Sequence, residues 1–161
     1  MTIAFVPGSF DPITLGHLDI IRRASEKYDR VIVAVLTNSS KQGKYLFNTM
    51  ERYDLIGDTV KDAGLDNVEI ATFEGLLADL VKKKCDPKDA ILVKGLRTVT
   101  DFEYEVQMAH LNRDLGVDTS FMLSTPEHSY TSSSMVKEVA RLNGDFDKYV
   151  TPYVAGWLRH K

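Results

Sequence analysis

The sequence predicts one doubly wound α/β domain, covering residues 1–161 and built on a five-stranded parallel sheet. Three observations predict this fold. Five short apolar runs have the length and much of the β-branched content of strands. The segments between them repeat apolar residues at helical spacing, and strands that alternate with helices are typical of a parallel sheet covered on both faces. The length of 161 residues also fits a single domain.

The expected strands are residues 3–6, 31–36, 68–73, 90–93 and 120–123. The run at 31–36 is apolar without a break, which is typical of a central strand buried on both faces. Turn signals at Pro7-Gly8, Asp86-Pro87 and Gly116 fall between the expected elements.

The expected helices carry apolar residues three and four positions apart. Three such stripes are Leu18, Ile20, Ile21 and Ala24; Tyr53, Ile56 and Val60; and Leu76, Leu77, Leu80 and Val81.

The segment 101–115 differs because it is apolar on two faces. Its stripes are Phe102, Val106 and Ala109, and Tyr104, Met108, Leu111 and Leu115. Such a helix is usually buried between two layers. It is either a central core helix of a monomer or a helix whose second layer belongs to another subunit, and the periodicity favours neither.

Composition and charge exclude several classes of protein. The formal net charge is −3 and the pI is about 5.8, whereas a nucleic-acid binder is normally basic over at least one face. Cys85 is the only cysteine, which excludes an intrachain disulfide and indicates a reducing compartment. Residues 1–6 are too short for a signal peptide, and the longest apolar run, 31–36, is too short to span a bilayer. We therefore expect a cytoplasmic protein with no nucleic-acid or membrane partner.

The first candidate site is PGSFDPITLGH at 7–17, which follows the first strand and opens the first helix. Ligands of open α/β sheets bind at the carboxyl ends of the strands, and a helix N-terminus there attracts phosphate. Ser9, Thr14 and His17 can donate hydrogen bonds to phosphate oxygens, while Gly8 and Gly16 allow close approach of the backbone. A turn followed by a surface histidine explains this segment, taken alone, equally well.

A serine run gives a second candidate site. The residues at 130–134, YTSSS, lie between the fifth strand and a helical run at 135–142. Alone they indicate a flexible loop or a helix N-cap, with Ser134 at roughly capping-box spacing from the pair Lys137-Glu138. At the same sheet edge as the first motif, they add hydroxyl and N–H groups suited to a polyphosphate.

Cations complete the pattern. Lys94 and Arg97 flank Gly95 at the end of the fourth strand, and Lys41 lies in the loop after the second. Each of these three cations, taken alone, can also be explained as a solvated surface charge. The sequence shows no Ser-His-Asp triad, no metal cluster and no Walker A loop. The pattern therefore predicts phosphoryl or nucleotidyl transfer by positioning and charge stabilisation, without a protein nucleophile.

Three segments, GSFDPITLGH, KGLRTVTDFEYE (94–105) and YTSSSMVKEVA (130–140), resemble the signatures of bacterial phosphopantetheine adenylyltransferases. This family belongs to the nucleotidyltransferase superfamily, whose T/HxGH motif matches Thr14-x-Gly16-His17. The resemblance runs from residue 3 to about 154 in matching order. It implies a Rossmann-like nucleotidyltransferase fold and reversible transfer of AMP from ATP to 4'-phosphopantetheine, giving dephospho-coenzyme A and pyrophosphate in coenzyme A biosynthesis.

The resemblance also implies the site residues. His17, Lys41 and Arg97 would be catalytic. Ser9, Lys41, Leu77 and Lys94 would bind phosphopantetheine. ATP would contact Ser9, Phe10, His17, Gly95, Leu96, Arg97, Glu105, His128, Ser129, Tyr130, Thr131, Ser132, Ser133 and Ser134.

The implied reaction is in-line attack of the acceptor phosphate on the α-phosphorus of ATP. A phosphate monoester is mostly ionised near pH 7, with a second pKa of about 6, so no general base is needed. The family further implies Mg²⁺ brought with ATP and held by phosphates and water, with no protein metal ligand. It also implies a homohexamer of two trimers and inhibition by coenzyme A.

Some positions depart from the commonest family pattern. Ser9 replaces Thr, His128 replaces an aromatic residue, and Lys94 replaces Arg, which trades a bidentate fork for a point charge. The loop 41–48 is also longer than usual. Two other functions stay open: a nucleotidyltransferase that adenylates nicotinamide mononucleotide or uses CTP, and a non-catalytic nucleotide-binding regulator. KGLR and DFEYE weigh against the first, and a regulator would not need His17 at the α-phosphate.

Overall fold

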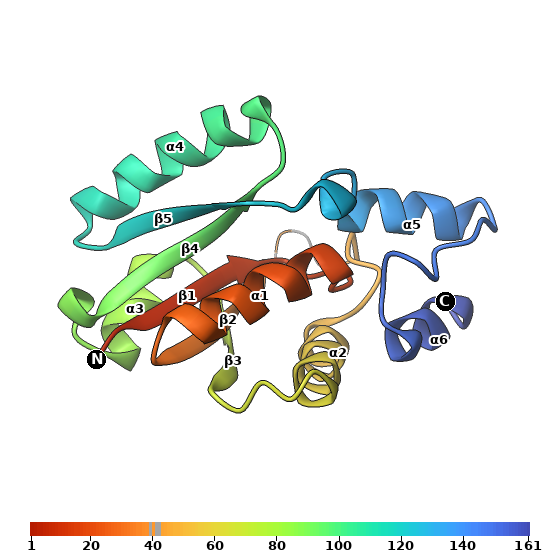
Figure 1. The fold of residues 1–161 in the computed structure, drawn as a ribbon, viewed down its shortest axis with the longest axis horizontal. Helices are drawn as coiled ribbons and strands as arrows, with labels where there is room; N and C mark the ends of the chain where they lie inside the picture. Colours follow the sequence, from red (N-terminus) through yellow and green to blue (C-terminus); the bar gives the residue numbers. More distant parts are fainter. Residues whose placement is uncertain (39, 41–42) are drawn as a thin grey trace.

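In the computed structural model, which describes residues 1–38, 40 and 43–161, five parallel strands form one sheet in the order β3-β2-β1-β4-β5 (Figure 1). The strands are β1 Ile3–Gly8, β2 Arg30–Leu36, β3 Val68–Phe73, β4 Ala90–Leu96 and β5 Asp118–Leu123. The strand order reverses between β1 and β4, and the carboxyl ends of these two strands form a topological switch point. The predicted doubly wound α/β fold is confirmed.

The helices are α1 Leu15–Lys27, α2 Thr49–Asp62, α3 Leu77–Lys84, α4 Val99–Asp114, α5 Ser133–Arg141 and α6 Pro152–Arg159. The short 3-10 helices η2 Pro87–Asp89 and η3 Pro126–His128 precede β4 and α5. Sequence reasoning missed α6, although its start carries a clear signal: Thr151 accepts a hydrogen bond from the N–H of Val154, and Pro152 occupies the first turn. No helix in the described part of the chain is long and apolar enough to cross a membrane.

The core lies on both faces of the sheet, as the unbroken apolar run of β2 predicts. Val31, Val33 and Val35 point into a cluster with residues of α1, α2 and α6, whereas Ile32 and Ala34 point into a second cluster with residues of α3. Alternate residues of a strand point to opposite faces, so a strand covered on both sides must be apolar throughout.

Four strands are longer than predicted. β1 continues through Pro7-Gly8, which the sequence predicted as a turn, because both residues still pair with β2, and β2 itself begins one residue earlier, at Arg30. β4 continues to Leu96 and β5 begins at Asp118, and their pairing includes Lys94 opposite Phe121 and Gly95 opposite Met122. Backbone hydrogen bonds extend β4 and β5 through polar residues and a glycine. A prediction from apolar runs therefore ends these strands too early. This extension carries Lys94 and Gly95 to the switch point in a fixed register.

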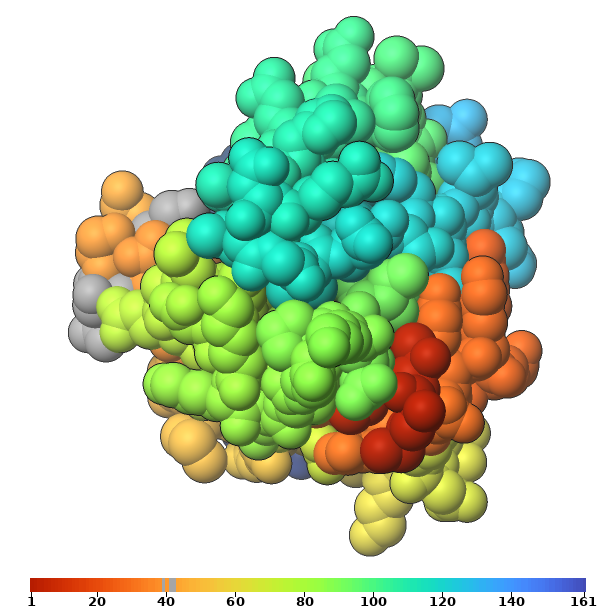
Figure 2. Space-filling model, turned by 90° about the vertical axis from the view of Figure 1, so that its left-hand side faces the viewer, coloured from red at the N-terminus to blue at the C-terminus, as the bar shows by residue number. Residues whose placement is uncertain are grey.

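The helix α4 packs on β5 but has no buried residue. Phe102 meets Phe121 edge to face, with ring centroids 5.8 Å apart. Several apolar side chains of the helix remain in solvent, with Val99 76% and Tyr104 63% exposed. Figure 2 shows α4 forming the upper part of the molecule. The interpretation of 101–115 as a central core helix of a monomer is therefore wrong.

Candidate functional site

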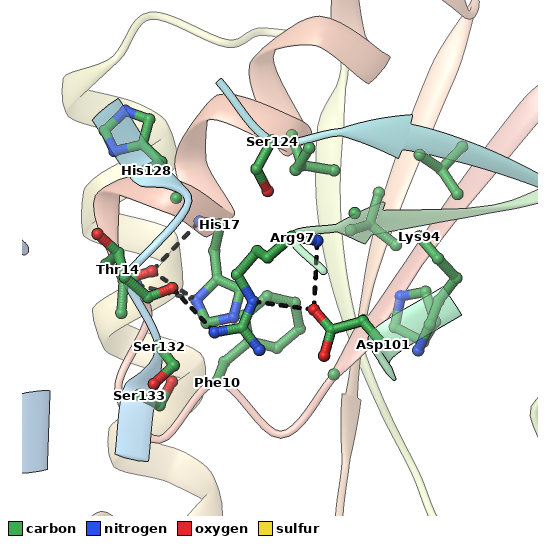
Figure 3. Close-up of a pocket in the computed structure, with 18 of the residues that line it drawn as sticks. Phe10, Thr14, His17, Lys94, Arg97, Asp101, Ser124, His128, Ser132 and Ser133 are labelled. Atoms are coloured by element: carbon green, nitrogen blue, oxygen red, sulfur yellow. Dashed lines mark hydrogen bonds and ion pairs between the residues drawn. The ribbon is translucent and has the colours of Figure 1, made fainter. Parts of the chain in front are cut away.

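A cavity of about 330 Å³ opens at the carboxyl ends of β1 and β4. It lies at the switch point, where the start of α1 faces the start of α5 (Figure 3). Its polar lining includes Thr14, His17, Lys94, Arg97, Asp101, Glu105, Ser124, His128, Thr131, Ser132, Ser133 and Ser134. The two predicted helix starts thus border the same cavity, together with the predicted cations Lys94 and Arg97.

His17 is held by the N-terminus of its own helix. Thr14 is the N-cap of α1, and its backbone N–H donates to Nδ1 of His17 at 3.0 Å while its Oγ1 accepts from the N–H of His17 at 3.3 Å. Since an N–H can only donate, Nδ1 carries no proton, and the neutral ring carries its proton on Nε2. The ring also packs against Phe10, with centroids 4.9 Å apart.

The charge state of His17 follows from its surroundings. Burial, and next the positive charges of Arg97 and Lys94, lower the pKa of His17 to about 4. At neutral pH the ring is therefore uncharged. It can donate a hydrogen bond from Nε2 to an anionic oxygen without bringing a charge of its own.

The two cations of the cavity are partnered by carboxylates of α4. Nζ of Lys94 lies 3.2 Å from Glu105, and Nε of Arg97 lies 3.4 Å from Asp101, whose carboxylate also accepts from the backbone N–H of Arg97 at 3.2 Å. Arg97 further donates to the carbonyl oxygen of Thr131 at 3.4 Å. These contacts hold both cations at the cavity, where they can face phosphate oxygens.

The serine run begins α5. Ser132 is the N-cap, and its hydroxyl accepts from the N–H of Met135 at 3.1 Å; the capping-box assignment to Ser134 is wrong. Ser133 donates to the carbonyl oxygen of Pro12 at 2.8 Å, which joins the start of α5 to the loop before α1. Two helix N-termini consequently border one cavity, and a helix N-terminus favours an anion.

A second cavity, of about 300 Å³, lies between the sheet and α4. It shares Pro7, Gly8, Lys94 and Glu105 with the first cavity. The rest of its lining is mainly apolar and includes Leu36, Phe73, Leu76, Leu77, Leu92, Met108 and Leu111, with Ser9, Tyr104, Asn112 and Thr119 as polar members. A ligand with an apolar or amide-containing arm and a phosphate at one end fits this distribution of polarity.

Buried Arg52 of α2 holds the backbone beside the second cavity. Its Nη1 donates to the carbonyl oxygens of Ser9 at 2.7 Å and Leu36 at 2.9 Å, and its guanidinium lies 4.1 Å from the ring centroid of Tyr45. The residue is only 1% exposed. A buried charge is tolerated when acceptors surround it, so Arg52 fixes the carboxyl ends of β1 and β2 relative to each other.

Among the described residues, no group of three or more His, Cys, Asp or Glu side chains is placed to hold a metal ion. Asp101 and Glu105 line the first cavity, but each is paired with a cation. These residues do not fit a metal ion resident on the protein.

Comparison with known proteins identifies the family. Residues 5–139 match the family described as Cytidylyltransferase-like. A phosphopantetheine adenylyltransferase of Clostridium perfringens is 51% identical over 93% of this chain and 88% of its own length. That of Deinococcus radiodurans is 44% identical over 98% of this chain and 92% of its own. The chain belongs to the phosphopantetheine adenylyltransferase family.

The fold is shared more widely than this family. A nicotinate-nucleotide adenylyltransferase candidate from Vibrio parahaemolyticus superimposes with a TM-score of 0.75 at 20% identity, covering 99% of this chain and 93% of that protein. A bifunctional NMN adenylyltransferase/ADP ribose pyrophosphatase from Francisella tularensis gives 0.68 at 17% identity, covering 92% and 44%. At these identities the likeness concerns the fold alone, whereas the resemblance of the motifs to phosphopantetheine adenylyltransferases is confirmed.

Most of the residues that the family resemblance predicts as ligand contacts lie at one of the two cavities. The first is lined by Phe10, His17, Lys94, Gly95, Arg97, Glu105, His128, Thr131, Ser132, Ser133 and Ser134, and the second by Ser9, Leu77, Lys94 and Glu105. Their roles toward a ligand stay predictions.

Other predicted contacts lie apart from both linings. The Leu96 side chain is buried in the protein, Ser129 donates its hydroxyl to the carbonyl oxygen of Pro126, and Tyr130 is 82% exposed. Lys41, predicted to be catalytic and to bind phosphopantetheine, lies outside the described residues.

Some residues that line the two cavities were missed by the sequence motifs. Asp101 is a counter-charge of Arg97 and lies in the first turn of α4, where an acidic side chain is favoured by the helix dipole, which was a usable signal. Ser124, at the end of β5, and Met108 and Asn112, on α4, line the cavities without any local sequence signal. Their position depends on how α4 packs against the sheet.

Proposed function

We propose that this protein transfers the AMP part of ATP to the phosphate of 4'-phosphopantetheine, giving dephospho-coenzyme A and pyrophosphate in coenzyme A biosynthesis. The observation that carries this proposal is the meeting of two unlike cavities. One is polar and lined by His17, Arg97 and the serine run; the other is mainly apolar, and both are bordered by Lys94. A triphosphate suits the first cavity and a pantetheine arm suits the second. Membership of the phosphopantetheine adenylyltransferase family supports the same assignment.

In this proposal ATP occupies the first cavity. The Nε2–H of His17 donates to an oxygen of the α-phosphate, and Arg97 and the N-terminus of α5 hold the β- and γ-phosphates. His17 is neutral and acts as a hydrogen-bond donor. Its hydrogen bond strengthens in the transition state because negative charge grows on the equatorial oxygens.

Phosphopantetheine occupies the second cavity, with its phosphate toward Lys94, Ser9 and Lys41. The acceptor phosphate then attacks the α-phosphorus in line, a new P–O bond forms, and the bond to the β-phosphate breaks to release pyrophosphate. The acceptor is already ionised near neutral pH, so the protein's task is alignment and charge stabilisation. His17, Lys41 and Arg97 perform that task.

Mg²⁺ enters this scheme as part of the substrate MgATP, bound through phosphate oxygens and water. That role agrees with a cavity whose carboxylates are engaged by Lys94 and Arg97. The exposed apolar face of α4 supports a homohexamer, in which α4 contacts another subunit. We further propose a cytoplasmic location and inhibition by coenzyme A, which shares the pantetheine arm.

The test is pyrophosphate release from MgATP with phosphopantetheine, with nicotinamide mononucleotide, or without an acceptor, and from CTP in place of ATP. Release only with ATP and phosphopantetheine is expected. Release with nicotinamide mononucleotide or CTP would keep the fold and the site but reject this substrate pair. Absence of release with every acceptor, from folded protein that still binds ATP, would favour the nucleotide-binding regulator.

A further inference from the structure

A buried carboxylate joins three segments around the first cavity. Asp11 is 2% exposed, and its Oδ1 accepts from the backbone N–H of Phe47 at 2.9 Å. Its Oδ2 accepts from the N–H of Leu46 at 2.9 Å and from Nζ of Lys137 at 3.0 Å. Asp11 thus links the loop after β1 to the segment before α2 and to the middle of α5.

Two of these links lead directly to the cavity. Asp11 follows Phe10, which lines the cavity and packs against His17. Lys137 lies one helical turn after Ser133 and Ser134, which line the opposite wall. Lys137 itself is absent from the linings of the two cavities, so its contact with Asp11 acts on the wall and not on the ligand.

We propose that Asp11 is a positioning residue for the adenylyl transfer proposed above. Through Lys137 it sets the distance between the serine run of α5 and the loop that carries Phe10 and leads into α1, the helix of His17. Through Leu46 and Phe47 it fixes the described part of the loop after β2 to the same point. The inference rests on the proposed function for its kinetic consequence, but the arrangement of the walls is testable through nucleotide binding alone.

The chemistry of the side chain explains why a carboxylate is needed. Ionised Asp offers only acceptor sites, and all three neighbours are donors. Asn at this position has one acceptor oxygen and an NH₂ group that would face a donor, so at least one link is lost. Because Lys137 is partly exposed, it would then turn to solvent, and α5 would lose its tie to the loop.

The experiment compares Asp11→Asn, Lys137→Met, Lys137→Arg and the double variant Asp11→Asn/Lys137→Met, with Glu138→Gln as control. Glu138 lies on the same helix and forms an exposed pair with Arg141. The readouts are the dissociation constant of α,β-methylene-ATP by calorimetry, kcat per binding-competent site, and Tm.

We expect Asp11→Asn and Lys137→Met to change analogue binding in the same direction, each weakening it on the order of tenfold. Both should lower kcat by roughly 10- to 100-fold at saturating ATP, since small misplacements of reacting groups are costly. Lys137→Arg should restore both values, and the double variant should lose no more than Asp11→Asn alone. Glu138→Gln should match the wild type.

The shared direction of the two single variants is the decisive result, because removing a negative and a positive charge has opposite long-range effects on a bound anion. Weaker binding with Lys137→Met but not with Asp11→Asn would make Lys137 a direct phosphate ligand and overturn the proposal. Wild-type values for Lys137→Met, or losses that multiply in the double variant, would also overturn it. If Asp11→Asn does not fold, Lys137→Met against Lys137→Arg decides. Should the wild type bind the analogue but release no pyrophosphate, the proposed function fails, and the binding series alone decides the role of Asp11.

Discussion

Gly95 of β4 and Ile20 of α1 are packed so closely that a Cβ at position 95 would lie 2.9 Å from Cγ1 of Ile20. Real Cβ atoms do not tolerate this distance, so any other residue at position 95 displaces the Ile20 side chain, α1 or the strand. Ile20 is three residues from His17 on the same helix, and both line the first cavity. The glycine therefore sets how near His17 stands to the strand that carries Lys94.

Gly95→Ala is expected to lower kcat/KM for ATP by roughly tenfold or more, because it shifts His17 relative to the phosphates. Steady-state kinetics and Tm measure the effect. Gly156→Ala is the matched control, since a Cβ on that residue of α6 meets nothing within 4 Å. Equal kinetic behaviour of the two variants would contradict the packing argument.

The tautomer of His17 can be observed directly. In ¹⁵N NMR spectra, Nδ1 should show the shift of an unprotonated nitrogen and Nε2 that of a protonated one, from pH 7 down to about pH 5, because the pKa of His17 is lowered to about 4. A protonated Nδ1 at pH 7 would refute the assignment made from the hydrogen bond to Thr14.

The same pKa predicts how stability depends on pH. Between pH 6.5 and about 4, the unfolded chain binds a proton on this histidine that the folded protein does not, so the free energy of unfolding falls as pH falls through that window. Urea unfolding at several pH values should show a smaller loss for His17→Gln. His160→Gln, at an exposed position near the C-terminus, should keep the wild-type slope.

His17→Ala tests the role of the ring in the reaction. We expect kcat to fall by about 10²- to 10³-fold, as for loss of one donor to a developing charge, while the Michaelis constant for ATP changes much less. An effect confined to the Michaelis constant would assign His17 to ground-state binding.

Arg52→Met should destabilise the fold by about 2–5 kcal/mol, because it leaves the carbonyl oxygens of Ser9 and Leu36 buried without a donor. Arg30→Met removes an exposed ion pair with Glu69 and should change stability by less than about 1 kcal/mol. Urea denaturation of both variants makes the comparison, and similar losses would contradict the stabilising role of the Arg52 hydrogen bonds.

The sequence was most informative where structure is local. Thr14, Gly16 and His17 lie within one helix start, and the serine run lies within another, so short-range motifs predicted both walls of the first cavity. The alternation of apolar runs likewise predicted the sheet, because burial of β2 on both faces demands an unbroken apolar strand.

Contacts between residues far apart in the sequence could not be predicted from it. Asp11 meets partners 35, 36 and 126 residues away, and nothing in its immediate neighbours indicates a buried acceptor of three hydrogen bonds. Met108 and Asn112 join the second cavity only because α4 packs on β5. For the same reason the sequence could not decide what covers α4. Its two apolar stripes fit burial by the same chain or by another subunit.

The ion pairs that Lys94 and Arg97 form with α4 reduce the conformational entropy that these side chains lose when a ligand binds. Asp101 and Glu105 already confine the side chains of Arg97 and Lys94, and long cationic side chains otherwise lose much rotamer freedom when they grip an anion. A phosphate that binds here meets cationic side chains that already occupy few rotamers. Less binding free energy is then lost in ordering these side chains, and more remains to align the reacting atoms.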